Sequence, residues 1–493
     1  MRKFKRMIAA IAAMTMVFGG VNAVGNAAEA TLKGDADLNG TVDLADLTTI
    51  AKYNLSSSSY PLANETAFAN ADVNDDGKVD GIDVSMLIET QLGKEYISAA
   101  DTGKTVELTA NLNTVSIQAS KPSSKFENSQ TELALSLLKN SLSEEENTLI
   151  SGYSAAQALA MTANGANGNT LKEMMDVIGG GTDISSFNDD MAGYNSGQPK
   201  DEECRLLTAN SIWYKNDESR FRVNKDFLVK NKSVYDAQIF AAPMDNDTLD
   251  DINSWVNEHT DKMIPSILDE LGDEVIMALV NAVTFDAKWT NPFDESYKSR
   301  GFFTAADGSG QDADVLSEEG GGYYLKDEEA RGILKYYKGG RYAFAAILPN
   351  EGTSANDYAK GLTAEKFSGL INSSEYKSLE VQMPKFSADY EGHWVDTLKA
   401  MGIKDAFDGA AADFSKMGRS ARSNICIGDV IQKTHIDVDE EGTRAAAATA
   451  VIATDCCARL YDEKLTFDRP FVYAIVDTQT NIPIFIGTLN TLK

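Results

Sequence analysis

The stretch from Asp439 to Ala450 reads Asp-Glu-Glu-Gly-Thr-Arg-Ala-Ala-Ala-Ala-Thr-Ala, and it is the most informative part of the chain. It begins acidic, passes through Gly442, and then consists almost entirely of small side chains. Side chains alternate between the two faces of a strand, so a strand here would carry Arg444 on the face opposite the small residues. Such a strand could enter a crowded sheet, and Gly442 would let the backbone pivot. The small face would hold Thr443, Ala445, Ala447, Thr449, Val451 and Ala453.

Composition alone favours a different structure, an Ala-rich helical turn, because Ala is the best helix former. However, the segment from Glu440 to Thr449 resembles the hinge of the reactive-centre loop in inhibitory serpins. The resemblance implies that a protease cleaves this loop and forms an acyl-enzyme, and that the loop then inserts as a new strand in the main sheet. The implied hinge residues are Glu440, Gly442, Thr443, Ala445, Ala446, Ala447 and Ala448.

Further serpin-like motifs follow in the family's order from about Phe126 to the end of the chain. They imply an α+β serpin fold over residues 126–493, with a large central sheet, helices and an exposed reactive-centre loop. The family's shutter matches Ser151, Ser154 and Asn281, its breach matches Trp289, and Gln432 stands where the family has a histidine. Gln can donate and accept hydrogen bonds, so it could maintain that network. The motifs are Asn147–Ala155, Gly165–Thr170, Leu279–Phe285 with Lys288-Trp289 and Pro292-Phe293, Gly402–Phe407, Ala412–Ser415, Arg469–Tyr473 and Ile484–Gly487.

Alignment of the loop to the family leaves two positions for the cleaved bond. Counting forward from the hinge glycine places it between Cys456 and Cys457, and a small apolar Cys456 suits a subtilisin-like or elastase-like protease. Counting back from Pro470 gives Arg459 instead, which suits a trypsin-like protease. We expect Cys456, because the sheet fixes the length of the inserted segment while the exit segment varies. The neighbouring cysteines could also be an incidental pair or a strained disulfide.

The N-terminus has the pattern of a signal peptide over residues 1–28. Four basic residues precede an apolar run from Met7 to Phe18, and small residues follow, with plausible cleavage after Ala23, Ala28 or Ala30. The apolar run is short for a membrane span, which needs about 20 residues, so we expect a secreted, extracellular protein. A net charge of −29 argues against nucleic acid or an anionic membrane as a partner.

Two acidic loops repeat near the N-terminus, beginning at Asp35 and Asp72. Both carry oxygen donors at positions one, three, five, nine and twelve and a glycine at position six, which is the arrangement that a calcium ion requires. A single loop of this kind can be an ordinary turn, but two with the same offsets predict two calcium ions. The expected metal residues are Asp35, Asp37, Asn39, Thr41, Asp43 and Asp46 in the first loop, and Asp72, Asn74, Asp76, Lys78, Asp80 and Asp83 in the second.

An apolar-patterned helix follows each loop, over Leu47–Tyr53 and Val84–Leu92. This duplicated unit, residues 31–97, resembles a dockerin, a small all-α calcium-binding module that binds cohesin modules of bacterial scaffoldins and so builds cellulosomes for polysaccharide degradation. The resemblance implies cohesin contacts at Leu44, Ala45, Gly81 and Ile82, which lack the Ser-Thr pair of one cohesin class. Residues 98–125, rich in Ser, Thr and Ala, are expected to be a linker.

Three functions are compatible with these motifs. The first is a covalent, single-use inhibitor of serine proteases that is tethered to a cellulosome. The second is a non-inhibitory serpin fold that is used only for binding. Charged or bulky hinge residues on the inward face would block insertion and favour this function, but the hinge has none on that face. The third is a cellulosomal hydrolase, but the serpin motifs fill the large domain, so we expect a protease inhibitor and not an enzyme.

Overall fold

The computed structural model describes residues 32–73, 77–91, 96–97, 103–117, 119, 121–199, 203–293, 299–420, 424–443 and 461–492, without the side chains of residues 82 and 89–91. The chain divides into two compact units. The first comprises residues up to 98 together with 217–226, and the second comprises residues 99–216 and 227–493. The expected signal peptide lies outside the described residues. Within the described residues, no helix has both the length and the apolar character needed to cross a bilayer.

The first unit is built around three helices, α2 (Leu44–Leu55), α3 (Glu65–Ala71) and α4 (Gly81–Gln91). Helix α2 starts where Asp43 and Asp46 form a capping box, in which each side chain accepts from a backbone N–H of the first turn. Leu47 and Ile50 of α2 pack against Val84 and Leu87 of α4, and these contacts form the core of the unit. Strand β1 (Tyr96–Ile97) pairs antiparallel with β5 (Phe221–Asn224) in the same unit. The two helices expected after the acidic loops are present as α2 and α4, and α3 is an additional one.

The main sheet of the second unit has seven strands in the order β13-β15-β16-β7-β4-β6-β2. All neighbours pair antiparallel except β4 and β6, which are parallel. Since β16 is antiparallel to both β15 and β7, these two flanking strands run in the same direction. The strands are β2 (Val106–Glu107), β4 (Cys204–Lys215), β6 (Gln238–Ala242), β7 (Met277–Lys288), β13 (Phe386–His393), β15 (Ile431–Val438) and β16 (Gly442–Thr443).

A second sheet of nine strands has the order β17-β12-β9-β10-β11-β18-β19-β3, and β8 pairs with β9. Its centre is fully buried, since every residue of β11, β18 and β19 is buried. Continuous apolar runs of this kind are typical of strands covered on both faces. The strands are β3 (Thr148–Ile150), β8 (Ser299–Thr304), β9 (Gly310–Lys326), β10 (Ala330–Tyr336), β11 (Tyr342–Pro349), β12 (Glu375–Pro384), β17 (Glu463–Thr466), β18 (Phe471–Asp477) and β19 (Ile482–Leu489).

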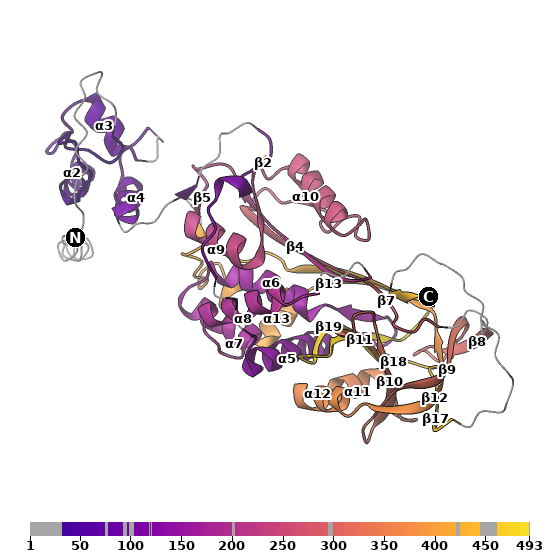
Figure 1. Ribbon diagram of the computed structural model, residues 1–493. Helices are drawn as coiled ribbons and strands as arrows, with labels where there is room; N and C mark the ends of the chain where they lie inside the picture. Colours follow the sequence, from indigo (N-terminus) through magenta and orange to yellow (C-terminus); the bar gives the residue numbers. More distant parts are fainter. Residues whose placement is uncertain are drawn as a thin grey trace. The chain divides into compact units, whose positions relative to one another are not determined.

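Helices surround the two sheets, and α5, α6, α7 and α8 lie together on one side of the main sheet (Figure 1). Helix α6 packs against both β7 of the main sheet and β19 of the second sheet, so it connects the two layers. The helices are α5 (Ser124–Ser141), α6 (Gly152–Ala163), α7 (Gly168–Gly179), α8 (Ile184–Ser196), α9 (Lys225–Tyr235), α10 (Asn246–His259), α11 (Ala355–Gly361), α12 (Ala364–Asn372) and α13 (Val395–Met401), with the 3₁₀ turns η1 (Thr109–Asn111) and η3 (Asp405–Phe407) and the short strand β14 (Gly418–Ser420).

Part of the segment expected to be a linker, residues 98–125, belongs to the second unit and forms regular structure there. Val106 and Glu107 form β2 and pair with β6 at the edge of the main sheet, and η1 follows directly. Helix α5 already begins at Ser124, where the Ser123 hydroxyl accepts from the N–H of Phe126. The Ser and Thr content of this segment therefore includes Thr109 of η1 and the helix cap Ser123 in addition to any spacer.

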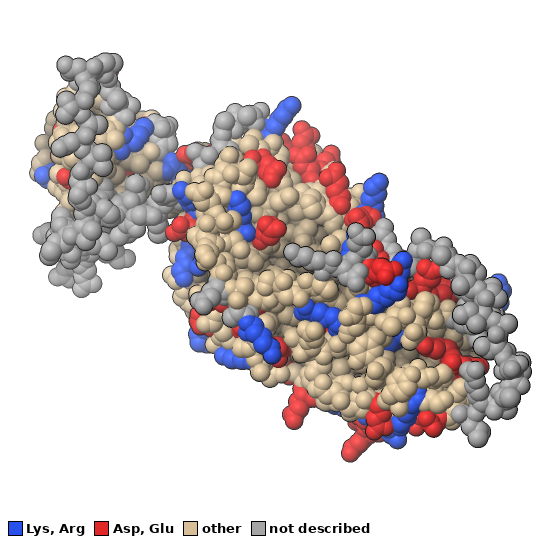
Figure 2. Space-filling model, viewed as in Figure 1, with Lys and Arg blue, Asp and Glu red and all other residues tan. Residues whose placement is uncertain are grey.

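Acidic and basic side chains are interspersed on the face of the second unit shown in Figure 2. Lys and Arg are scattered among Asp and Glu there and do not form one continuous basic stripe. A surface of this kind offers no concentrated positive field for a polyanion on that face.

Candidate functional site

The start of the hinge lies within the main sheet as the two-residue strand β16. Gly442 pairs with Lys288 and Thr443 with Ala287 on β7, while Thr443 also pairs with Val438 on β15. Thr443 is only 2% exposed. The chain therefore enters the space between β15 and β7 at this end, and its first inward side chain is already buried.

Gly442 is required here by close packing. A Cβ atom at this position would overlap the carbonyl oxygen and carbon of Ala287 on β7. The backbone can approach β7 closely enough to pair only because the side chain is absent. Close packing against β7 is therefore a second reason for a glycine at position 442, in addition to the expected pivot. The sequence alone does not reveal this second reason.

Trp289 holds the chain just before β16. Its indole N–H donates to the carbonyl of Asp439 at 2.9 Å, and its backbone N–H donates to the carbonyl of Glu441 at 2.8 Å. The backbone N–H of Phe293 donates to the carbonyl of Glu440 at 2.8 Å, and Lys385 forms an ion pair with the Glu440 carboxylate. Trp289, expected at the breach, therefore fixes two of the three acidic residues that precede the hinge glycine, and Phe293 and Lys385 hold the third.

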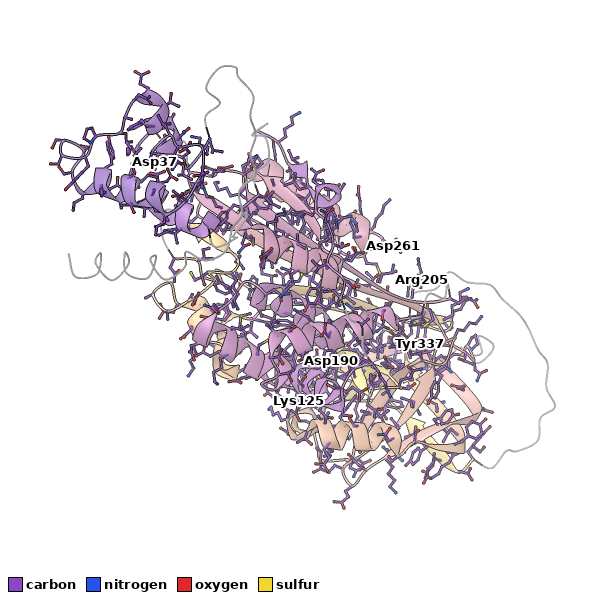
Figure 3. All side chains as sticks on the ribbon, turned by 60° about the vertical axis from the view of Figure 1, so that its left-hand side comes forward. Asp37, Lys125, Asp190, Arg205, Asp261 and Tyr337 are labelled. Carbon is purple, nitrogen blue, oxygen red and sulfur yellow. The ribbon has the colours of Figure 1, made fainter. Side chains whose placement is uncertain are left out.

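Tyr337 links Trp289 to the hinge. Its ring stacks on Trp289 with centroids 4.4 Å apart and planes 16° from parallel, and its hydroxyl forms a 2.6 Å hydrogen bond with the Thr443 hydroxyl. Tyr337 is labelled in Figure 3, inside the second unit. Burial raises the pKa of the Tyr337 phenol well above its usual value, although the hydrogen bond with Thr443 opposes this, so the group stays protonated. Sequence reasoning missed Tyr337, since 106 residues separate it from Thr443.

Gln432 and Ser151 join β15 to the start of α6 beneath the hinge. The Gln432 side-chain oxygen accepts from the Ser151 backbone N–H, and its amide nitrogen donates to the Ser151 carbonyl, both at 3.0 Å. The Ser151 hydroxyl donates to the carbonyl of Ile484 on β19 at 2.9 Å. A glutamine can satisfy both backbone groups of one residue at once, so Gln432 does maintain a network at the position of the family's histidine.

Ser154 and Asn281 continue this network toward β4. The Ser154 hydroxyl donates to the side-chain oxygen of Asn281 on β7. The Asn281 amide then donates to Asn210 on β4 at 2.6 Å, and Asn210 donates to Gln157 of α6 at 3.0 Å. The structure thus brings together all four residues expected at the shutter, and it adds Asn210 and Gln157, which carry no motif that sequence reasoning could use.

The remaining loop residues lie outside the described residues. These are Ala445, Ala446, Ala447 and Ala448 of the expected hinge, and Cys456, Cys457 and Arg459 at the two candidate bonds.

The described residues of the two acidic loops share three structural features. In each, the N–H of the glycine at position six donates to the first aspartate, Gly40 to Asp35 at 3.0 Å and Gly77 to Asp72 at 2.9 Å. Both glycines have positive φ, 84° and 81°, which a residue with a side chain adopts only with strain. The last aspartate of each loop likewise accepts from the backbone N–H at position nine, at 2.8 Å for Asp46 and 2.7 Å for Asp83.

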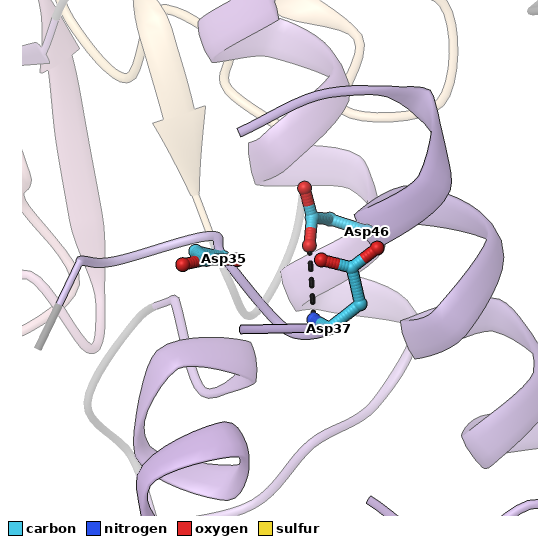
Figure 4. A group of neighbouring side chains, drawn as sticks. All are labelled: Asp35, Asp37 and Asp46. Atoms are coloured by element: carbon cyan, nitrogen blue, oxygen red, sulfur yellow. Dashed lines mark hydrogen bonds between the residues drawn. The ribbon is translucent and has the colours of Figure 1, made fainter. Parts of the chain in front are cut away.

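The first loop brings three carboxylates together. Ligand oxygens of Asp35, Asp37 and Asp46 lie within 4.8 Å of one another, with Asp35 and Asp46 buried (Figure 4). Burial raises the pKa of Asp46, and the negative charges of Asp37 and Asp35 add to this, while backbone N–H donors from residues 43 and 37 oppose it. A buried cluster of like charges is unfavourable without a cation, so this oxygen-only donor set fits a hard ion such as calcium.

Asp72 and Asp83 of the second loop are buried like their counterparts, and Asp80 and Lys78 are also described. Asn74 and Asp76 lie outside the described residues. Thr41 is exposed and its hydroxyl hydrogen-bonds to Asn39.

The residues expected to contact a cohesin begin the helices after the loops, with Leu44 first in α2 and Gly81 first in α4. Ala45 and Gly81 are exposed and Leu44 is half-buried, whereas the side chain of Ile82 is not described.

These features define an α+β protein whose main sheet contains the beginning of the expected hinge, joined to a small module with paired acidic loops. Comparison with known families assigns both parts. The model of the family Serpin (serine protease inhibitor) matches residues 128–492, and that of the Dockerin type I domain matches residues 33–90. The chain belongs to the serpin family and carries an N-terminal dockerin, which confirms the predicted fold class.

Individual relatives agree with this assignment. Iris from Ixodes ricinus is 30% identical over 70% of this chain and 92% of its own length. An uncharacterized serpin-like protein of Methanosarcina acetivorans is 27% identical over 72% of this chain and 83% of its own. The crystal structure of the thermophilic serpin Tengpin in its native state is 39% identical with a TM-score of 0.73, covering 79% of this chain and all of that one. Members of the serpin family are protease inhibitors and not enzymes, although some are non-inhibitory.

The Gln432 bridge can be tested by replacing it with leucine, which has a similar size but no polar atoms. We expect Gln432→Leu to lower the free energy of unfolding by roughly 1–3 kcal/mol, because it leaves the buried N–H of Ser151 without its partner. The Ser151 carbonyl would lose one of two donors, since it also accepts from the N–H of Ala155. Thermal or urea unfolding monitored by circular dichroism measures the change. Gln479→Leu, at an exposed position, is the matched control and should leave the midpoint unchanged. Equal stability of both variants would contradict the bridge.

Proposed function

We propose that this protein is a secreted inhibitor of serine proteases that acts once, by loop cleavage and strand insertion, while its dockerin tethers it to a cellulosome. The observation that carries the proposal is β16, where a buried threonine and a closely packed glycine begin a strand between β15 and β7. The signal-like N-terminus over residues 1–28 supports export. The serpin and dockerin family matches support the pairing of inhibitor and tether.

The first chemical step would be ordinary protease acylation. The protease serine oxygen attacks the carbonyl carbon of Cys456, the peptide C–N bond to Cys457 breaks, and the new amine of Cys457 leaves with a proton. The protease is then joined to the loop by an ester, and water would normally release it. A subtilisin-like or elastase-like protease suits Cys456. If Arg459 precedes the cleaved bond instead, the same steps apply to a trypsin-like protease.

Insertion would follow from the hinge. The inserting strand can continue from Thr443 antiparallel to both β7 and β15, as β16 already does. Each added residue would gain ladder hydrogen bonds to its neighbours, and small side chains would fit between the strands. The loop would carry the esterified protease with it, so that insertion competes with hydrolysis of the ester.

The dockerin would bind two calcium ions, one in each loop. The first loop would use the side chains of Asp35, Asp37, Asn39, Asp43 and Asp46 and the backbone carbonyl of Thr41. The second loop would use the same positions beginning at Asp72. Calcium would neutralise the buried carboxylates and hold the starts of α2 and α4 in place. These helix starts carry Leu44, Ala45, Gly81 and Ile82, which we propose as the contact with a cohesin module.

Calcium stoichiometry tests this part of the proposal. Isothermal titration of the full-length protein, after removal of metal by a chelator, should give two calcium ions per chain. The variants Asp46→Asn and Asp83→Asn should each bind only one calcium ion. Each substitution removes a buried negative charge from one loop while keeping the shape of the side chain. The double variant should bind none and still inhibit protease. Asp357→Asn, at a position outside the loops, is the control and should bind two. A wild-type value other than two would contradict the proposal.

The hinge is tested by Thr443→Arg, which places a guanidinium where Thr443 is buried against Tyr337. We expect this variant to behave as a substrate, because burying an unpaired charge costs roughly 3–5 kcal/mol and delays insertion until the ester hydrolyses. Mass spectrometry should show the wild-type protein in a covalent complex with a subtilisin-like protease and the variant only as a cleaved chain.

Arg444→Glu is the matched control, because strand alternation puts residue 444 on the opposite face, and it should still form the complex. The peptide released by the wild-type reaction should begin at Cys457. A peptide beginning at Leu460 would place the cleaved bond after Arg459. A stable covalent complex with Thr443→Arg would show that strand insertion is wrong for this protein, and it would favour a non-inhibitory serpin fold used for binding.

A further inference from the structure

A cavity of about 490 Å³ opens where β9 and β10 separate. The ladder between the two strands runs from Arg331↔Lys326 to Leu334↔Tyr323 and ends there. Beyond that point β9 continues along β12, while β10 continues along β11. The resulting fork leaves a hollow within the size range of small-molecule sites.

Three consecutive glycines, Gly320, Gly321 and Gly322, keep this fork open. The hydroxyl end of Tyr376, from the neighbouring strand β12, occupies the space that a side chain at Gly321 would take. Tyr376 is nevertheless 69% exposed. The tyrosine thus lies over the glycine backbone and still presents a large apolar surface to solvent. Aromatic side chains often cover a glycine of a neighbouring strand in this way.

Two further tyrosines complete an aromatic rim. Tyr323 meets Tyr376 edge to face at 5.3 Å and meets Tyr336 in the same manner at 5.0 Å. Such edge-to-face contacts fix ring orientation. Because the neighbouring rings hold Tyr376 in place, a planar or chair-shaped ring can stack on it with little loss of side-chain entropy.

The inner wall combines a charged pair with the aliphatic residues Ile333, Leu334, Leu379 and Val381. Lys335 is buried and forms a 2.6 Å ion pair with Glu318, and its ammonium also lies 4.1 Å from the centre of the Phe293 ring. Burial lowers the pKa of Lys335, and Glu318 opposes this shift. Asn291 and Thr290 also line the cavity, and the Thr290 hydroxyl donates to the carbonyl of Tyr337 at 2.9 Å. The Lys335–Glu318 pair offers both hydrogen-bond donors and acceptors, and its net charge is zero. It therefore suits a neutral ligand with several hydroxyl groups.

We propose that this fork is a binding site for a neutral sugar of one or two rings, stacked on Tyr376 with its hydroxyl groups directed at Glu318 and Lys335. A sugar combines an apolar C–H face with hydroxyl groups that both donate and accept, and so matches the tyrosine rim and the charged inner wall. An apolar ligand would leave the Lys335–Glu318 pair without water or a new partner, which is costly for buried charges.

The site does not depend on the inhibitory mechanism, because none of its rim or wall residues belongs to the hinge. Lys335 is the link to the breach, since its ammonium also lies 5.7 Å from the centre of the Trp289 ring. Loss of protease inhibition would therefore leave the sugar site testable, and failure of the sugar site would leave the inhibitory mechanism intact.

Titration calorimetry of the full-length protein with cellobiose, xylobiose and mannobiose tests the proposal. We expect one-to-one binding of at least one of these sugars. Tyr376→Ala should weaken that binding by about tenfold, since it removes the exposed stacking surface. Glu318→Gln, which keeps the side-chain shape, should also weaken it. Phe302→Ala, in β8 of the same sheet and 75% exposed, is the control and should bind as the wild type does.

Absence of binding by all three sugars would overturn the proposal. The proposal also fails if Tyr376→Ala, shown to be folded by circular dichroism, binds the sugar as tightly as the wild type. Binding of 1-naphthoate without binding of any sugar would identify a site for an apolar acid and would likewise overturn it.

Discussion

The contact between the Thr443 and Tyr337 hydroxyl groups holds the beginning of the loop inside the main sheet, and the proposed function depends on it. Tyr337 is fixed by stacking on Trp289, which in turn binds the backbone of the acidic residues before Gly442. The hinge is therefore held on both sides of Gly442 by groups that are themselves buried. Each of these contacts involves only a few residues, yet together they set where a new strand would start and which of its side chains would face inward.

The strand directions explain why the main sheet could accept another strand. Strands β7 and β15 run in the same direction, and β16 runs opposite to both. A strand continued from Thr443 would give each of them an antiparallel partner, and antiparallel ladders are slightly more stable per residue than parallel ones. The Gln432–Ser151 bridge and the Ser154–Asn281 contact fasten β15 and β7 to helix α6 below the hinge. These contacts thus oppose any separation of β7 and β15 that a longer inserted strand would require.

The sequence predicted the fold class, Trp289 beside the hinge and the four residues of the network below it, because the small-residue pattern and the ordered motifs are continuous in the chain. It predicted the two acidic loops and the helix after each of them for the same reason. It could not predict Tyr337, whose role depends on a contact between distant segments, nor the packing reason for Gly442, which depends on the carbonyl of Ala287. Helix α3 was missed, although Asn64 caps it. The pairing of β2 with β6 was also missed, because a two-residue edge strand has too short a pattern to recognise.

Hydrogen exchange of β7 and β15, measured by mass spectrometry before and after protease cleavage of the loop, tests the central claim most directly. Strand insertion would give both strands a new hydrogen-bonded neighbour along their length. The account therefore predicts that exchange of backbone amides in residues 277–286 and 431–437 slows by about tenfold or more after cleavage, while exchange in β11 stays unchanged. Unchanged exchange in β7 and β15 of the cleaved protein would contradict insertion between them.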